Sequence, residues 1–270
     1  MRSSWSGSPG GREALAASPS GPGGPEADAT RGAEMFARYA YAPNALGYCG
    51  PPLGATLRDG SVDEVRRAAT KFSGAWPYLR VLSALTGIAD PLDHRLVESY
   101  WLGGGVGAML DPETLLQELL SIIGPQAGRY WSHLTGELAG EAAANHCFHV
   151  FGVYPWTRFL GRGMDEHPLG VLDNCRITWG TVVSRAGDEV EVTCRQLVSD
   201  GRELGLSEPA PRRLEVWADG YSAVPDVALG DTVAVHWGRL CGRLDSNQVS
   251  SLADSTDRQL RVTSERLAHV

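Results

Sequence analysis

The spacing of hydrophobic residues changes once along this chain, near residue 165. Before that point apolar residues recur every three or four positions, as Val65, Ala69 and Phe72 do, which is the spacing of one helix face. After it, apolar and polar residues alternate in short runs, at 175–185, 188–198, 212–219 and 231–240. Alternation of this kind is typical of strands with one buried side. The pattern therefore predicts an α+β protein, with helices first and strands second.

Helix-start signals in the first region predict four to six helices. Ser61, with Glu64 three residues later, forms a capping-box pattern that begins a helix over 61–87, which Pro77 kinks or splits. An aspartate followed by proline begins two further helices, at 90–105 and 111–124. We also expect a short amphipathic helix from Gly32 and a longer one from Arg129 to about Val150.

The second region predicts a small barrel. Ala186-Gly187-Asp188 is a hairpin turn between the first two alternating runs. Four or five short strands are too few for a sandwich, so we expect a closed or nearly closed β-barrel of the OB-like kind. Residues 246–270 then form a C-terminal helix whose apolar side chains lie roughly on one side.

These elements divide the chain into four parts. Residues 1–30 are rich in Gly, Pro, Ser and Ala and carry almost no large apolar groups. Such a segment cannot offset the entropy of ordering, so it predicts a disordered tail. The α-helical domain follows over 31–160, the β-barrel over 165–245, and the C-terminal helix over 246–270.

Charge and composition argue against several classes of function. The formal net charge is −8 and the pI is about 5.4, which disfavours nucleic acid and anionic membranes as partners. No run approaches the roughly 20 apolar residues of a membrane span, and the N-terminus lacks the apolar segment of a secretory signal. We therefore expect a cytoplasmic protein without membrane insertion. Its five scattered cysteines, without a CxxC pair, are expected to be reduced thiols.

Cys175 is the first candidate for chemistry, because the common nucleotide-binding and hydrolase motifs are absent from the sequence. It precedes a predicted strand and follows the polar Asp173-Asn174 turn, where a thiol is accessible. An accessible thiolate can act as a nucleophile or as a ligand for a soft metal. The alternative is a core cysteine, because free cysteine is among the most buried residue types. Position alone leaves both interpretations open.

Histidines are the other candidates. His236 lies on the opposite side of its run from Val233 and Val235, where a hydrogen-bonded barrel histidine is the simpler interpretation. His146 and His149 are one turn apart if their segment is helical, a spacing that suits two metal ligands. The alternative is a pair of histidines satisfied at a helix end. Further ligands would have to come from elsewhere in the chain, such as Cys49, His133 or His167.

Two segments of the second region carry a resemblance to a known family. Cys175-x-x-x-x-Gly180-x-Val182 is followed by a predicted hairpin, by DVALGDTVAVHWG at 226–238 and by a terminal helix. This order resembles the HypC-type chaperones of NiFe-hydrogenase maturation, over roughly 172–260. The resemblance implies a HypC-like barrel and a carrier or docking role. In that family the cysteine helps to hold an iron carbonyl-cyanide unit and bonds a partner's cysteine, and the strand histidine assists. By position these residues are Cys175 and His236, and thiolate with imidazole is an iron-competent pair.

The whole chain is also similar to an uncharacterised bacterial family associated with hydrogenase gene clusters, through ARYAYAPNALGYCGPP, NHCFHVFGVYPWTRFL and LDNCRITWG in this order. The resemblance implies a non-enzymatic accessory or maturation factor. Its partners would be the hydrogenase large subunit or other maturation proteins, and its cofactor, if any, a transient iron unit. Cys49, His146 and His149 are candidate metal-handling residues of the helical domain. Two alternatives stay open: a structural adaptor with a HypC-like barrel, and a metal-binding enzyme that uses the HCFH segment at 146–149.

Overall fold

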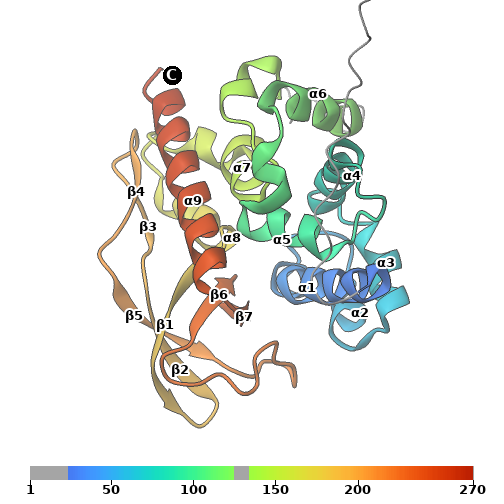
Figure 1. The fold of residues 1–270 in the computed structure, drawn as a ribbon. Helices are drawn as coiled ribbons and strands as arrows, with labels where there is room; N and C mark the ends of the chain where they lie inside the picture. The colour runs from blue at the N-terminus through green and yellow to red at the C-terminus, as the bar shows by residue number, and fades with distance from the viewer. Residues whose placement is uncertain (1–23, 125–133, 270) are drawn as a thin grey trace, which may run out of the picture.

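The structure is a computed structural model that describes residues 24–124 and 134–269, and it has an α+β fold. Figure 1 shows α1–α6 to the right of the long C-terminal helix α9, β3–β5 to its left, and β1, β2, β6 and β7 below its lower end. The helices of the first part are α1 (Pro25–Ala45), α2 (Gly54–Asp59), α3 (Val62–Ala69), α4 (Ala75–Thr86), α5 (His94–Leu102), α6 (Pro112–Ile123) and the single turn α7 (His146–Phe148). A π-helical turn, η5 (His149–Val153), continues α7 directly, and 3-10 turns lie at η1 (Gly105–Met109), η4 (Gly136–Gly140) and η6 (Pro155–Phe159).

Two of the helix-start predictions are confirmed and several boundaries are wrong. The Ser61 capping box is formed, and Asp111 caps α6. The predicted helix over 61–87 is split between α3 and α4, and Pro77 lies in the first turn of α4, where its missing N–H costs nothing. Asp93 caps α5 in place of the expected Asp90.

Larger corrections apply at the two ends of the helical region. The helix α1 begins at Pro25, inside the segment predicted as a disordered tail, and residues 1–23 lie outside the described residues. The long helix predicted from Arg129 to Val150 is wrong over 134–145, which forms turns and η4 before α7 begins at His146. Residues 125–133 lie outside the description.

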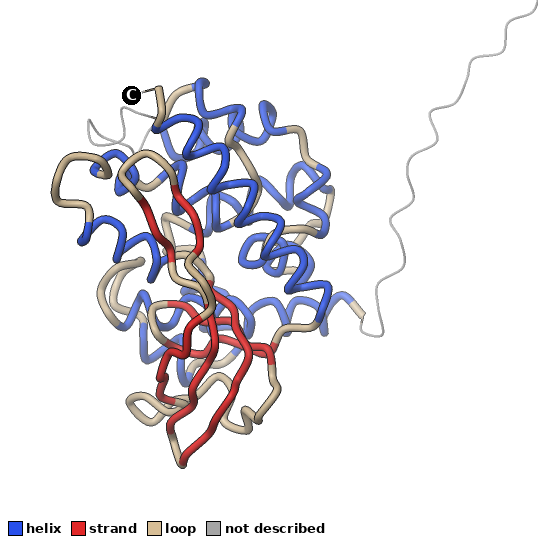
Figure 2. Tube along the Cα trace, turned by 90° about the vertical axis from the view of Figure 1, so that its left-hand side faces the viewer, coloured by secondary structure: helices blue, strands red, loops and turns tan. Residues whose placement is uncertain are grey.

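The strands form a five-stranded antiparallel sheet in the order β5-β2-β1-β6-β7. Its members are β1 (Thr178–Ala186), β2 (Glu189–Cys194), β5 (Ala210–Glu215), β6 (Thr232–His236) and β7 (Arg239–Arg243). The predicted hairpin turn at Gly187 joins β1 to β2. A separate pair, β3 (Leu197–Ser199) and β4 (Leu204–Leu206), is antiparallel as well. Figure 2 shows the strands of the larger sheet gathered at the lower end of the molecule.

The predicted closed barrel is not found among the described residues. The strands β5 and β7 are the edges of the sheet and are not hydrogen-bonded to each other as a ladder. Side chains connect them instead, because Arg239 at the start of β7 forms an ion pair of 2.9 Å with Glu215 at the end of β5. The sheet is therefore open, with its two edges connected by an exposed ion pair.

The segment around Cys175 also differs from the prediction. Cys175 does not begin a strand: it is the last residue of α8 (Glu166–Cys175), and β1 starts at Thr178. Gly180 on β1 faces β2 so closely that a Cβ there would lie 2.3 Å from the carbonyl oxygen of Thr193. The close pairing of β1 with β2 therefore requires glycine at this position.

The helix α9 (Ser246–Leu267) confirms the predicted C-terminal helix, and it begins with a capping box between Asp245 and Gln248. One hydrophobic core runs through α1–α6 and continues into Ile177, Ala234 and Leu252 of the sheet region and α9. Helices and sheet therefore share packed side chains, and the site described below lies where they meet.

Candidate functional site

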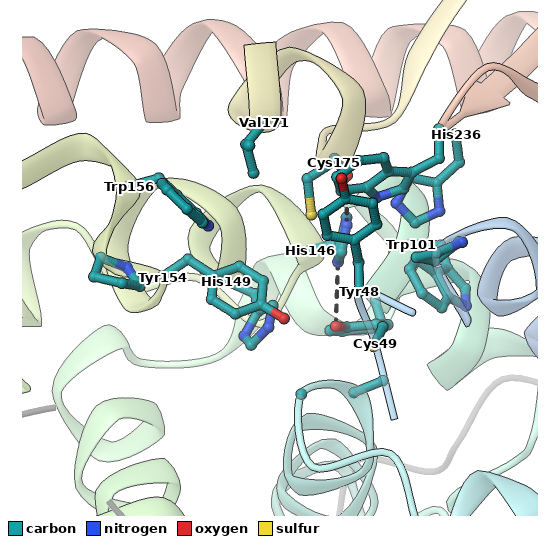
Figure 3. A pocket seen from close by; sticks show the side chains of 16 residues that line it. Tyr48, Cys49, Trp101, His146, His149, Tyr154, Trp156, Val171, Cys175 and His236 are labelled. Atoms are coloured by element: carbon teal, nitrogen blue, oxygen red, sulfur yellow. Dashed lines mark hydrogen bonds between the residues drawn. The ribbon is translucent and has the colours of Figure 1, made fainter. Parts of the chain in front are cut away.

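A cavity of about 230 Å³ lies between the helices and the sheet, and all five residues singled out from the sequence line it (Figure 3). These residues are Cys49, His146, His149, Cys175 and His236. They come from the loop after α1, from the α7–η5 turns, from the end of α8 and from the end of β6. Six aromatic side chains complete much of the wall: Tyr48, Tyr100, Trp101, Tyr154, Trp156 and Trp237.

His236 is held in one tautomer by the backbone of α1. Its Nδ1–H donates to the carbonyl oxygen of Tyr39 at 2.7 Å, and a carbonyl can only accept. That carbonyl lacks its usual partner within α1, because the residue four positions later is Pro43, which has no N–H. The Nε2 atom of His236 therefore carries a lone pair, and this buried atom has no hydrogen-bond partner within residues 24–124 and 134–269. An imidazole fixed through Nδ1 with Nε2 left free is the usual arrangement of a metal-binding histidine.

His146 is hydrogen-bonded at both nitrogens. Its Nε2–H donates to the carbonyl oxygen of Cys175 at 2.9 Å, so Nδ1 accepts from the hydroxyl of Tyr100 at 3.2 Å. The rings of His146 and His236 meet edge to face, with centroids 5.2 Å apart, and the Trp101 ring packs against both. Burial lowers the pKa of His146 well below its ordinary value, and it lowers the pKa of His236 to about 4. Both imidazoles are therefore neutral at neutral pH.

Cys175 lies beside these histidines because two local contacts fix the end of α8. The backbone N–H of Trp237 donates to the carbonyl of Asn174, which ties the residue after His236 to the residue before Cys175. The buried guanidinium of Arg176 pairs with Asp173 at 2.8 Å and donates to the carbonyl of Arg195. The Cys175 residue is 8% exposed, and burial raises the pKa of its thiol well above the ordinary range. The thiol is therefore neutral and buried in the cavity, which agrees with the core-cysteine alternative and not with an accessible thiol.

One ligand atom each from His146, Cys175 and His236 lies within 4.8 Å of the other two. A transition-metal ion bonds imidazole nitrogen at about 2.0 Å and thiolate sulfur at about 2.3 Å, so side-chain adjustments of about 1 Å would bring the three donors onto one ion. The free Nε2 of His236 and the mixed nitrogen and sulfur donor set fit iron, zinc or copper better than magnesium or calcium. The residues therefore fit a soft or borderline transition metal.

His149 and Cys49 line the same cavity but lie outside this group of three donors. The His149 ring stacks on His146 with centroids 6.0 Å apart and contacts Tyr154 at 4.6 Å. Burial lowers the pKa of His149 to about 4 and raises the pKa of Cys49 to about 11. The helical spacing expected for 146 and 149 therefore brings both rings to one cavity, although only His146 joins the donor group. His167 packs on Trp156 and lines a neighbouring surface cavity, and His133 lies outside the described residues.

Tyr48 and Trp237 separate the inner cavity from the surface. Their rings stack with centroids 3.9 Å apart. Both residues, together with Val171, line the inner cavity and also the open surface cavity beside α8. Tyr48 lies between Gly47 and Gly50, which both have positive φ, in the loop that leaves α1. The two rings and Val171 therefore lie between the inner cavity and this surface cavity.

Sequence reasoning missed the parts of the site that hold the donors in place. Nothing in the pattern identified Tyr100, which bonds His146, or the backbone carbonyl of Tyr39. A usable signal was nevertheless present, because a proline inside a helix frees the carbonyl four residues before it. Pro43 thus marks Tyr39 as an available acceptor.

Fold and site together define an α+β protein with a buried, uncharged cysteine–histidine cavity between its helices and its sheet. Residues 28–270 match the family of unknown function DUF6390, so the chain belongs to that family. The match spans the helices, the sheet and α9 as one unit. Comparison with curated proteins and with solved structures finds no match. Among the described residues, the helices are all too short or too polar to cross a membrane.

Proposed function

We propose that this protein holds a transition-metal centre through Cys175, His236 and His146. The observation that carries the proposal is the convergence of these three donors within 4.8 Å, around a His236 Nε2 that has no hydrogen-bond partner in the described part of the chain. Binding replaces the Cys175 thiol proton with the ion. His146 would hold the ion through Nε2 once its proton lies on Nδ1, from which it would donate a hydrogen bond to the Tyr100 hydroxyl oxygen. The hydrogen bond from Nε2–H to the Cys175 carbonyl would then be lost. The Tyr39 carbonyl and the Tyr100 hydroxyl would thus stabilise the ligand tautomers of the two histidines.

The finer proposal is that the metal is iron and that the protein is an accessory factor of NiFe-hydrogenase maturation. Its support is the HypC-type pattern at Cys175 and His236, because these two residues are neighbours in space although 61 positions separate their numbers (236 − 175). The burial of Cys175 favours holding an iron unit over forming a disulfide with a partner's cysteine, since the thiol lies behind the Tyr48–Trp237 stack. The expected partner is the hydrogenase large-subunit precursor or another maturation protein.

A second candidate is a structural adaptor that binds a partner without metal. The neutral, buried state of Cys175 and of both histidines is the observation that favours it, because buried groups of this kind also occur as ordinary core residues. In an adaptor, substitution of Cys175 would lower stability and leave partner binding intact.

Anaerobic titration of the purified chain with Fe(II), and with Co(II) as a spectroscopic probe, tests the proposal. We expect one ion per chain and a sulfur-to-cobalt charge-transfer band that is lost in Cys175→Ser. His236→Gln and His146→Gln should each weaken binding by roughly 100-fold or more, since even outer-shell partners contribute 10–100-fold. Cys194→Ser is the matched control, because Cys194 is a buried thiol on β2 outside the cavity.

Two results would contradict the proposal. Wild-type protein that takes up no ion under these conditions removes the metal site altogether. Equal binding by the Cys175→Ser and Cys194→Ser proteins removes Cys175 as a ligand. Co-purification with the hydrogenase large subunit, compared between wild type and Cys175→Ser, then separates the maturation factor from the adaptor, because an adaptor keeps its partner in both.

A further inference from the structure

The cavity is larger than a metal ion needs. Its volume is about 230 Å³, whereas a single water molecule occupies a cavity of roughly 10–15 Å³ on this measure. An apolar cavity of roughly 150 Å³ is enough to bind benzene in another protein. The cavity therefore has room for a ring-sized molecule beside the three donors.

The lining of the cavity restricts what such a molecule can be. Asp, Glu, Lys and Arg are absent from its described lining, so a charged organic ligand would lose its hydration without gaining a counter-charge. Most of the wall is apolar and much of it is aromatic, which suits the edge-to-face and offset contacts of another planar ring. The chemistry of the wall thus selects an uncharged, flat molecule.

The space has two ends, seen in Figure 3. His236, Cys175 and Trp101 lie at one side of the view, and Tyr154, Trp156 and His149 lie at the other. His149 is 4% exposed, and its Nδ1 has no hydrogen-bond partner among the described residues. Gly74 at the start of α4 leaves room for this ring, because a Cβ there would lie 2.9 Å from His149 Nε2. A buried nitrogen without a hydrogen-bond partner lowers the stability of the fold unless a ligand supplies that partner.

We propose that the His149 end of the cavity binds an uncharged, one-ring aromatic molecule that carries a single hydrogen-bonding group. The ring packs among Tyr154, Trp156 and Val171, and its polar group meets the imidazole of His149. This site goes beyond the proposed metal function and does not depend on it, because His149 lies outside the donor group.

Fluorine NMR with metal-free protein tests this inference, with 4-fluorophenol as the probe and 4-fluorobenzoate as its charged counterpart. We expect saturable binding of the phenol and at least tenfold weaker binding of the benzoate. Val171→Phe, which fills the cavity from α8, should abolish phenol binding. Val183→Phe on the exposed side of β1 is the matched control and should bind as wild type does.

His149→Phe gives a second, gentler variant, because it keeps an aromatic ring and removes the unpartnered nitrogen. It should bind 4-fluorophenol roughly tenfold more weakly, by the loss of one hydrogen bond, and bind fluorobenzene no worse than wild type does. Absence of saturable phenol binding by wild type overturns the inference, as does equal binding of phenol and benzoate. If Cys175→Ser binds 4-fluorophenol as wild type does, the aromatic site is separate from the metal donors. The metal site is tested independently by the ion titration.

Discussion

The imidazole of His236 is hydrogen-bonded to the backbone of Tyr39, 197 positions earlier in the chain. The bond connects the end of β6 to the middle of α1 and fixes which nitrogen of His236 is free. A donor of the sheet is thus oriented by the helical part, and neither part alone contains a complete site.

Tyr100 should act as a positioning residue for His146. Tyr100→Phe removes the hydroxyl that bonds Nδ1, and we expect metal affinity to fall by 10–100-fold, the usual effect of losing an outer-shell partner. Tyr78→Phe is the matched control, because the buried Tyr78 hydroxyl has no hydrogen-bond partner among the residues that the structure describes. Its removal should leave affinity unchanged and should not lower the melting temperature. Equal affinities for the two variants would show that Tyr100 does not orient the ligand.

Metal affinity should rise with pH. The pKa of the Cys175 thiol is raised by burial, so the thiol stays protonated between pH 6 and 8 and must release one proton on binding. The pKa of His236 is about 4, so this ligand does not compete for protons in that range. The association constant measured by competition with a chelator of known pH dependence should therefore increase about tenfold per pH unit. A flat profile would exclude a thiol that deprotonates on binding.

Acid should destabilise the metal-free protein before carboxylates titrate. His149 and His236 have pKa values of about 4 in the folded chain against an ordinary 6.5, so the unfolded chain binds more protons between these values. Stability is therefore constant above about pH 6.5 and is lost as the pH falls towards 4, by on the order of 3 kcal/mol per histidine. Urea unfolding at a series of pH values measures this loss. His149→Phe should make the unfolding free energy depend less steeply on pH. An unchanged dependence would contradict the lowered pKa of His149.

Removal of the Tyr48 ring should speed the loading of the cavity. Tyr48 stacks on Trp237 at the partition between surface and inner cavity, and Tyr48→Ala opens that partition without touching a donor. We expect stopped-flow cobalt binding and release to accelerate together, while the equilibrium constant changes little. Leu46→Ala, an exposed residue of the same loop, is the control. Loading that is equally fast in both variants and in wild type would place the entrance elsewhere.

Loss of the Glu141 carboxylate should lower the free energy of unfolding more than loss of an exposed carboxylate does. Its buried carboxylate is bonded to Arg266 of α9 and lies beside Gln259 and Thr263. Glu141→Ala leaves the partly buried Arg266 guanidinium with the Phe151 carbonyl as its remaining acceptor, and it should cost about 1.5–3 kcal/mol in denaturant unfolding. The exposed pair Arg261–Glu265 on the same helix is the comparison, and Glu265→Ala should cost about 0.5 kcal/mol or less. Similar losses of unfolding free energy for Glu141→Ala and Glu265→Ala would mean that Arg266 does not hold the Glu141 carboxylate.

The sequence predicted elements well where periodicity is uninterrupted, and failed where it is not. The alternating runs became β1, β2, β5 and β6–β7; β1 and β2 have one buried side as expected, whereas β6 is buried on both sides. The helix α8 was missed since Pro168 and Gly170 interrupt its pattern, although Pro168 lies in the first turn, where proline is tolerated. The prediction of a closed barrel was wrong because the number of strands does not reveal whether the two edge strands pair.

The candidate site was predictable residue by residue but not as an arrangement. Each of the five residues chosen from the sequence lines the cavity, yet the grouping of His146 with Cys175 and His236 depends on the docking of α7 against α8 and β6. That docking is tertiary packing, which local patterns do not encode. For the same reason the aromatic wall was not foreseen, and the sequence could not decide between the accessible and the buried Cys175.

The long separation between Tyr39 and His236 also bears on biosynthesis. Contacts between distant parts of a chain close late, because the entropy of the intervening loop must be overcome first. On the ribosome, α1 emerges long before β6 is made, so the Tyr39 carbonyl has no imidazole to accept from until β6 has been synthesised. A chain cut before β6 therefore lacks both this contact and the sheet side of the cavity.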